Sequence, residues 1–399
     1  MDRVRHHERV VAVSVSTALV MTGQGMAGPV LPVFAREFGV SLAAVGATVA
    51  AFGLARLLLN VPLGSLADRR GRRILLVGGP LVFAIGMTGA GLAGGIVSLT
   101  AWRFVSGAGS AMYMTGALVY LTDVSTPANR GRLIGVNQGA LLFGQAIGPG
   151  LGGLIADAVG IRAPFFVIGA AGLLASIHAY FRLEETRPKN SRQHFEHGAE
   201  TRPRWREIIG SRTFLSIALV NFVIFFTRAG SKNTLMPLEG VTVLGLSVGE
   251  IGLVLTGIAL INLALLSPAA NFSDRHGRTR AIVPSLFGVA AALTVISLAG
   301  DVTWFLVGAG ILAVSTAISG PAPAAFAADN APEVSRGVSL GMFRTAGDVG
   351  LLVGPPLLGW IADAGGYGIA FATNAGLVAV AAVVFHLIKR ESIVGRVEQ

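Results

Sequence analysis

Apolar residues occur along almost the whole chain in runs separated by short charged or turn-rich segments. A run of about 20 residues forms a helix that crosses ~30 Å of hydrocarbon, since an α-helix rises 1.5 Å per residue. The first run has no small-residue cleavage site after it, so we interpret it as a helix and not as a removable signal peptide. The pattern predicts twelve membrane-spanning helices near residues 9–31, 43–64, 74–93, 97–121, 134–156, 162–183, 212–231, 249–269, 281–299, 303–327, 337–361 and 367–388.

Composition agrees with this pattern. Hydrophobic residues occupy 53% of the 399 positions, charged residues only 13%, and the mean hydropathy is +0.68. Soluble domains carry about 25% charged residues, so a soluble fold of this composition is excluded. The absence of cysteine excludes a disulfide framework, an iron–sulfur cluster and a thiolate nucleophile, and we expect no bound metal. The sequence therefore predicts an all-α integral membrane protein.

The net charge of +10 does not indicate a nucleic-acid partner, because the basic residues lie between the apolar runs. With the N-terminus in the cytoplasm, 24 of the 31 basic residues lie on the cytoplasmic side, four lie inside spans, and Arg36, Arg162 and Lys232 lie outside. This asymmetry follows the positive-inside rule and predicts that both termini are cytoplasmic. Only three basic residues are lysine, which favours a GC-rich bacterial genome. We expect a multi-pass protein of the bacterial inner membrane.

The halves of the chain are related by a constant offset of 206 residues. The polar stretch 184–211 is a predicted cytoplasmic linker between two six-helix bundles, residues 1–183 and 212–399. Because six spans is an even number, both halves have the same orientation, as in rocking secondary transporters. The repeated positions are Asp68, Gly71, Arg72 and Asp123 with Asp274, Gly277, Arg278 and Asp329; Gly144, Gly148, Pro149 and Gly153 with Gly350, Gly354, Pro355 and Gly359; and Asp157 with Asp363.

Four segments carry a resemblance to a known family: GSLADRRGRR at 64–73, LTAWRFVSGAGSA at 99–111, GQAIGPGLGG at 144–153 and PVLP at 29–32. The chain resembles the major facilitator superfamily, and within it the twelve-helix drug:proton antiporter branch. The resemblance implies alternating access in a monomer that binds a small-molecule substrate and protons in a lipid bilayer. It also implies that the proton gradient supplies the energy, without a cofactor.

The resemblance assigns the segment 64–73 to a gating motif. By position, its charge network consists of Asp68, Arg72 and Asp123 and holds the cytoplasmic side closed, while glycines permit the tight turn. The alternative is that the arginines only enforce topology. The complete predicted gating set is Gly64, Asp68, Gly71, Arg72 and Asp123, with a copy at Asp274, Gly277, Arg278 and Asp329.

The glycine run in the fifth span could be mistaken for a phosphate-binding loop. It lies inside an apolar helix, however, where small residues let two helix backbones approach. The resemblance makes this segment the antiporter motif of the fifth helix, with members Gly144, Gly148, Pro149, Gly152 and Gly153.

A charged side chain inside the membrane costs free energy to insert, so it is rarely without a function. The charged residues inside the predicted spans are therefore candidates for proton coupling. Asp348 is the acid predicted inside a span, Arg344 lies four residues earlier on the same helix face, and Arg56 is a second candidate partner. The pair is either a fixed structural ion pair or a proton switch. Arg103 in the fourth span completes the predicted coupling set.

Residues predicted to line the substrate cavity are Gln24, Arg103, Tyr113, Met114, Asn221 and Phe225. Gln24 stands where many multidrug members of the branch have an acid, and arginines outnumber acids inside the predicted spans. A neutral or anionic amphiphile is therefore at least as well supported as a cationic one. The leading hypothesis is proton-coupled efflux, and the alternative is an organic-anion exchanger or symporter. An enzyme is disfavoured because the sequence has no HExxH motif and no intramembrane carboxylate pair.

Overall fold

The computed structural model describes residues 2–126, 129–186, 210–331 and 336–397, and their regular structure is entirely helical. Within these described residues, eleven helices are long and apolar enough to cross a membrane. The last of them is interrupted by a non-helical residue, Gly366, and so contains two spans. The predicted all-α fold with twelve spans is confirmed.

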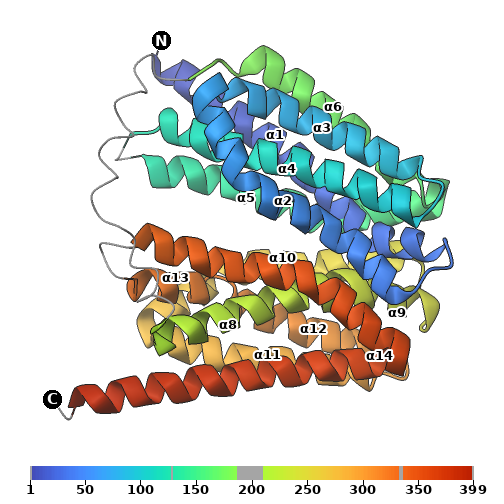
Figure 1. Ribbon diagram of the computed structural model, residues 1–399, viewed down its shortest axis with the longest axis vertical. Coiled ribbons are helices and arrows are strands. Elements are labelled where there is room, and N and C mark those ends of the chain that lie inside the picture. The colour runs from blue at the N-terminus through green and yellow to red at the C-terminus, as the bar shows by residue number, and fades with distance from the viewer. Residues whose placement is uncertain (1, 127–128, 187–209, 332–335, 398–399) are drawn as a thin grey trace. The chain divides into compact units, whose positions relative to one another are not determined.

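The chain divides into two compact units. The first contains residues 1–40, 47–196 and 246–256. Its helices are α1 (Asp2–Arg36), α2 (Leu42–Arg70) without its first turn, α3 (Arg73–Gly91), α4 (Ile96–Asp123), α5 (Arg130–Val159) and α6 (Ala163–Arg182). Within this unit α1 packs against α5, and α3 packs against both α4 and α6 (Figure 1).

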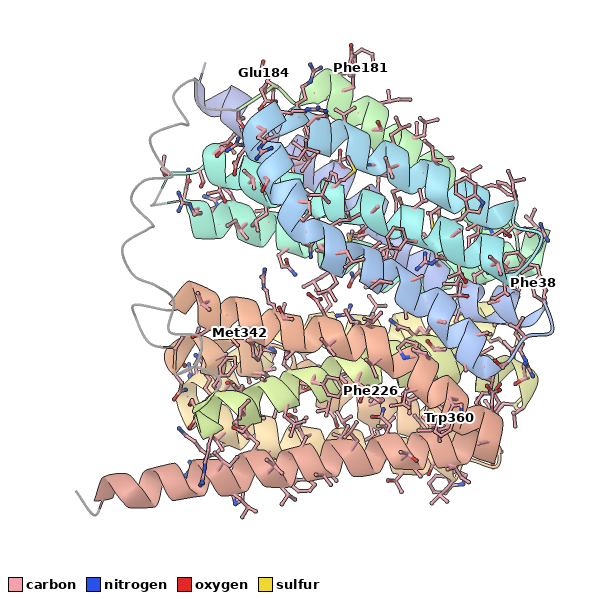
Figure 2. The ribbon with its side chains drawn as sticks, in the orientation of Figure 1. Phe38, Phe181, Glu184, Phe226, Met342 and Trp360 are labelled. Atoms are coloured by element: carbon pink, nitrogen blue, oxygen red, sulfur yellow. The ribbon has the colours of Figure 1, made fainter. Side chains whose placement is uncertain are left out.

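The second unit contains residues 41–46, 197–245 and 257–399. Its elements are α8 (Arg212–Phe226), the π-helix η3 (Thr227–Leu235), α9 (Met236–Thr242), α10 (Val248–His276) without its first turns, α11 (Arg278–Ser297), α12 (Val302–Ser319), α13 (Ala322–Asp329) and α14 (Arg336–Val397). Phe226, labelled in Figure 2, lies where α8 packs against Gly350 and Gly354 of α14.

The turns between helices repeat with the same offset as the motifs. In the described part of the chain, six glycines have a positive φ angle, a backbone conformation that residues other than glycine rarely adopt. They form three pairs separated by 206 residues: Gly39 with Gly245, Gly71 with Gly277, and Gly160 with Gly366. Each half of the chain therefore turns with the same backbone geometry at corresponding positions.

The seventh span is longer than predicted. α8, η3 and α9 form one continuous span, Arg212–Thr242, whereas the sequence pattern predicts an end near residue 231. Polar residues in the segment TRAGSKNTL favour an end of the helix, but the helix continues through them, and three of their hydroxyl groups are hydrogen-bonded within the second unit: Thr227 and Ser231 to Asn374, and Thr234 to the carbonyl of Ala229. Lys232, which the charge count places outside, lies inside this span.

Hydrogen bonds between buried side chains hold the helices of each unit together. In the first unit, Tyr113 on α4 and Asn137 on α5 both bond to Thr17 on α1, at 2.8 and 2.7 Å. In the second, Asn374 on α14 bonds to Thr227 and Ser231 of η3, at 3.2 and 2.7 Å. Such bonds are retained because a buried polar group without a partner is costly.

Candidate functional site

The predicted gating residues of the first half are in contact. The Arg72 guanidinium donates through Nε to Asp123 Oδ2 at 2.7 Å, and its Nη2 lies 3.5 Å from Asp68 Oδ1. Only 8% of the Arg72 side chain is exposed, against 44% for Asp68. Nη1 also donates to the carbonyl of Ala67, 3.1 Å away. We call Asp68, Arg72 and Asp123 the N-half cluster.

Residues at the start of the predicted linker extend this cluster. Glu185 accepts hydrogen bonds from the backbone amides of Arg72 (2.9 Å) and Arg73 (3.1 Å), and so caps the start of α3. Thr186 Oγ1 donates to Asp123 Oδ2 at 3.0 Å. The positive φ angle of Gly71 favours glycine at this turn, and a Cβ there would push the Glu185 carboxylate away from the start of α3. Sequence analysis missed Glu185; the rest of the linker, residues 187–209, lies outside the described residues.

The second half contains the same arrangement in a more exposed form. Arg278 Nε donates to Asp329 Oδ2 at 3.2 Å, and Nη1 binds Asp274. The Arg278 side chain is 27% exposed and both carboxylates are more than half exposed. We call Asp274, Arg278 and Asp329 the C-half cluster; solvent weakens its ion pairs relative to those of the buried Arg72.

The glycines of the fifth-span motif bring α5 against α1. Gly144, Gly148 and Gly152 form a stripe at intervals of four residues, and a Cβ at any of them would clash with the α1 backbone. Pro149 lies inside the same continuous helix. The motif is therefore a helix-packing surface, in agreement with the interpretation as close packing and not as a phosphate loop.

Two carboxylates cap helices at the predicted outer end. Asp157, near the end of α5, accepts a hydrogen bond from the amide of Gly249 at 2.9 Å and caps α10 within the first unit. Asp363 of α14 accepts from the amides of Leu42 and Ala43 at 2.8 and 2.9 Å and caps α2 within the second unit. Sequence analysis identifies this pair of aspartates as a repeat but assigns it no role.

A glycine lies four residues before each capping aspartate. A Cβ at Gly153 would clash with the carbonyl of Val248, and a Cβ at Gly359 would clash with the carbonyl of Leu42. Leu42 and Val248 are also 206 residues apart, so the same glycine–aspartate contact with a helix start occurs once in each half of the repeat. Either glycine, if replaced by alanine, would push the capped helix away from its aspartate.

Arg103 is buried within the first unit without an acidic partner among the described residues. Its Nη1 lies 3.5 Å from the sulfur of Met87, its guanidinium carbon lies 4.7 Å from the centre of the Phe52 ring, and Nε has no hydrogen-bond partner. A cation held by a ring and a thioether remains able to attract an anion.

The predicted coupling residues of α14 differ in burial. Asp348 is half-buried and Arg344 is exposed. Their pairing and their part in proton coupling stay a prediction. Arg56 is half-buried on α2.

The seventh span holds two charges that sequence analysis did not assign to the membrane. Lys232 lies in η3 and is half-buried, and Glu239 lies in α9 with only 6% of its surface exposed. Glu239 Oε2 is buried and has no hydrogen-bond partner. The signal that could have found them is helical continuity through Pro237, which is tolerated in the first turn of α9.

The predicted cavity residues have different environments. Tyr113 is fully buried and donates to the carbonyl of Val13 at 2.9 Å, and buried Asn221 donates to the carbonyl of Phe343 at 2.7 Å. Both side chains therefore join helices in this conformation. Gln24, Met114 and Phe225 are half-buried, which leaves part of each side chain accessible.

Comparison with known sequences decides the family. The sequence model of the Major Facilitator Superfamily matches residues 13–242 and matches again at 223–397. The chain belongs to this superfamily. The double match corresponds to the two halves related by the 206-residue offset, and the recognition from the motifs is confirmed.

Several proteins similar to this major facilitator protein have names that refer to transport or drug resistance. An uncharacterised MFS-type transporter of Methanocaldococcus jannaschii is 24% identical over 89% of this chain and 92% of its own length. Multidrug resistance protein 1 of Bacillus subtilis is 30% identical over 61% of each chain. A solved bacterial homologue of the human lysosomal transporter Spinster, in an inward-facing and unoccupied conformation, has a TM-score of 0.83, 16% identity and 97% coverage of both chains. The protein is thus a multi-pass membrane carrier of small molecules and not an enzyme.

Proposed function

We propose that this major facilitator protein exports a small amphiphilic molecule in exchange for protons, by alternating access. The observation that carries the proposal is that breakable polar contacts occur at both ends of the same two helices. The first turn of α2 is capped by Asp363, and its last turn carries Asp68 of the N-half cluster. The first turn of α10 is capped by Asp157, and its last turn carries Asp274 of the C-half cluster.

In this proposal α2 and α10 open and close the two ends of the substrate pathway, because the contacts at their ends can form and break. Asp157, Asp363 and the two carboxylates of the C-half cluster are exposed, so their hydrogen bonds are modest in energy and can break without unfolding a helix. The N-half cluster, with its buried Arg72, is the stronger of the two cytoplasmic contacts in this proposal. Release of the aspartate caps at one end, with the clusters intact at the other, corresponds to one of the two access states. Release of the clusters with the caps intact corresponds to the other.

Proton coupling in this proposal uses acids of the second unit. Asp348 is half-buried, and Glu239 has a buried carboxylate oxygen without a hydrogen-bond partner. Protonation of such a group removes a charge that is costly to hold at membrane depth, and so changes the relative stability of the two access states. The proton gradient is the proposed energy source, without a cofactor.

The proposed substrate class draws on the relatives. One relative is named a multidrug resistance protein, which supports a small amphiphilic drug or metabolite. We propose that the protein acts as a monomer in the bacterial inner membrane with both termini in the cytoplasm, in keeping with the distribution of its basic residues.

A second function, organic-anion exchange or symport, is favoured by Arg103 and Lys232. Neither has a carboxylate within ion-pair distance among the described residues. Two embedded cations without acidic partners suit an anionic substrate.

The test is substrate-induced proton movement in proteoliposomes, with a panel of neutral, anionic and cationic amphiphiles. The parent is compared with Asp348→Asn, with Glu239→Gln and with the exposed control Glu37→Gln. Counterflow exchange, which needs no proton gradient, checks that each variant folds and binds. We expect one buried-acid variant to keep exchange and lose proton movement, while Glu37→Gln behaves as the parent. Exchange of anions without proton movement in the parent would favour the second function.

A further inference from the structure

Glu239 is an acid enclosed near the predicted outer end of the seventh span. It lies in α9, three residues before the span ends at Thr242, which corresponds to about 5 Å along a helix. Its chain neighbours Leu238 and Gly240 are buried, as is Leu235 one turn earlier. The carboxyl group is therefore close to the predicted outer surface but enclosed by the protein.

The surroundings of Glu239 do not compensate a negative charge. Among the described residues, its Oε2 has no hydrogen-bond partner and its carboxylate forms no ion pair. An ionised carboxylate in such a position is costly, and protonation removes the cost. The packing of α9 in this structure therefore favours the neutral acid.

The neighbouring elements offer no counter-charge in place of a proton. α9 contacts η3, which precedes it, and α14, through a bond between Thr242 and Tyr367. Asp363 of α14 is already bound to the amides of α2. The charged and titratable residues that η3 and the outer part of α14 carry are Arg228 and Lys232, and Asp363 and Tyr367, respectively.

The last turn of α9 is held to α14 by a long hydrogen bond. The hydroxyls of Thr242 and Tyr367 are 3.3 Å apart, at the long end of hydrogen-bonding distances. The turn itself closes on Glu239, whose carbonyl accepts from the amides of Val243 and Leu244 at 2.9 and 3.1 Å. Because a neutral bond of this length contributes little, the turn that carries Glu239 can move away from α14.

A movement of this turn reaches the outer cap of α10 along the chain. Residues 243–247 join α9 to α10 and turn at Gly245, whose φ angle is +70°. The first turn of α10 is the one that Asp157 caps through Gly249. Because the connection is short, a displacement of the end of α9 pulls on that first turn.

We propose that Glu239 is a proton-dependent switch for the outer end of the protein. With a proton bound, the neutral carboxyl stays enclosed, α9 stays against α14, and the outer end is closed. When the proton passes to the outer water, the remaining carboxylate must be hydrated, so the last turn of α9 leaves Tyr367 and α10 leaves the Asp157 cap. The inference rests on the proposed function, which makes the caps the outer gate. It gives Glu239 the control of that gate and leaves Asp348 as the proposed coupling acid.

The direction of the pH dependence follows from linkage. The closed arrangement holds the proton more tightly than the open one, so acid favours closure and a rise in pH favours opening. A variant with a neutral side chain at position 239 is therefore held closed at every pH.

The test measures the outer end of the full chain in nanodiscs, without substrate. Because the chain has no cysteine, spin labels can be attached at Leu92→Cys and Leu298→Cys. Both positions are exposed, follow the last residues of α3 and α11, and are 206 residues apart. Pulsed electron resonance then gives the distance between the labels as the pH is raised.

Four variants are compared with the parent. Glu239→Gln mimics the protonated acid, Glu239→Asp keeps an ionisable group, and Tyr367→Phe removes the bond to Thr242. Glu37→Gln is the matched control, because it removes an exposed acid near the predicted outer surface. A melting curve establishes that each variant is folded.

We expect the ratio of long to short distances in the parent to rise about tenfold or more from acid to alkaline pH. Glu239→Gln keeps the short distance throughout, whereas Glu239→Asp and Glu37→Gln retain the response. Tyr367→Phe retains it too but opens at a lower pH, since the closed state has lost a bond. A parent that ignores pH, or a folded Glu239→Gln that still responds or stays open, would overturn the switch.

Transport measurements separate this inference from the proposed function. A parent whose outer end responds to pH through Glu239, but which moves no substrate in exchange for protons, would refute the proposed export alone. Proton-coupled export by a parent whose outer end ignores pH would refute the switch alone.

Discussion

Asp363 accepts hydrogen bonds from the backbone amide of Leu42, at 2.8 Å, although the two residues are 321 positions apart. Its second carboxylate oxygen binds the amide of Ala43, so both oxygens cap α2. The related Asp157 caps α10 with Oδ2 alone, through Gly249. Asp363 thus uses two carboxylate oxygens where Asp157 uses one, and this difference allows a test of whether the caps close the outer end.

The first prediction compares Asp→Asn at these two positions. Asparagine keeps one acceptor oxygen, so Asp157→Asn can retain its single bond, whereas Asp363→Asn must lose one of two. We expect Asp363→Asn to open the outer end more than Asp157→Asn, and alanine at either position to cost the cap about 0.5–2 kcal/mol. Because the chain has no cysteine, a single cysteine at Gln24 reports opening by its alkylation rate from the outer side. Equal rates in all variants would exclude the caps as an outer gate.

The second prediction concerns the two clusters. Asp123→Ala leaves the buried Arg72 guanidinium without its closest carboxylate, and breaking a buried pair costs about 3–5 kcal/mol. Asp329→Ala affects the more exposed Arg278, for which about 0–1 kcal/mol is expected. Thermal unfolding, followed by tryptophan fluorescence, should therefore show a clearly larger loss of Tm for Asp123→Ala. Equal losses would contradict the difference in burial.

The third prediction tests the packing of α5 on α1. At Gly152 an alanine Cβ would clash with the Met26 backbone, and overpacking of this kind costs about 1–3 kcal/mol. Gly139 on the same helix has open space around it, so Gly139→Ala should be neutral or stabilise the helix by about 0.5–1 kcal/mol. Opposite signs of the two changes in Tm are expected. Destabilisation by both would mean that α5 needs glycine for a reason other than contact with α1.

Much of the fold follows from local sequence. Long apolar runs give helices because a bilayer offers no other partner for backbone polar groups. Gly71 and Gly277 mark turns whose positive φ angle requires glycine, and the repeated Asp–Arg spacing locates both clusters. The helices, the turns and the two clusters could be predicted because each depends on neighbouring residues or on the 206-residue repeat, and both can be seen in the sequence.

Other features depend on distant contacts and could not be predicted. Glu185 caps α3 across 113 residues, and Asp363 caps α2 across 321. The span containing Lys232 extends beyond residue 231 because Asn374 of α14 binds the polar side chains of η3. The spacing of Arg344 and Asp348 predicts which face of α14 the two side chains share, but helical periodicity does not predict that Asp348 is half-buried while Arg344 is exposed.

The most direct test of the account is whether a proton gradient drives transport uphill. Proteoliposomes loaded at low internal pH, with the parent inserted so that its cytoplasmic face is outside, are given a labelled amphiphile and followed over time. The account predicts accumulation inside above the external concentration, and collapse of that accumulation when a protonophore is added. Equilibration to the external concentration, unchanged by the protonophore, would contradict proton-coupled export.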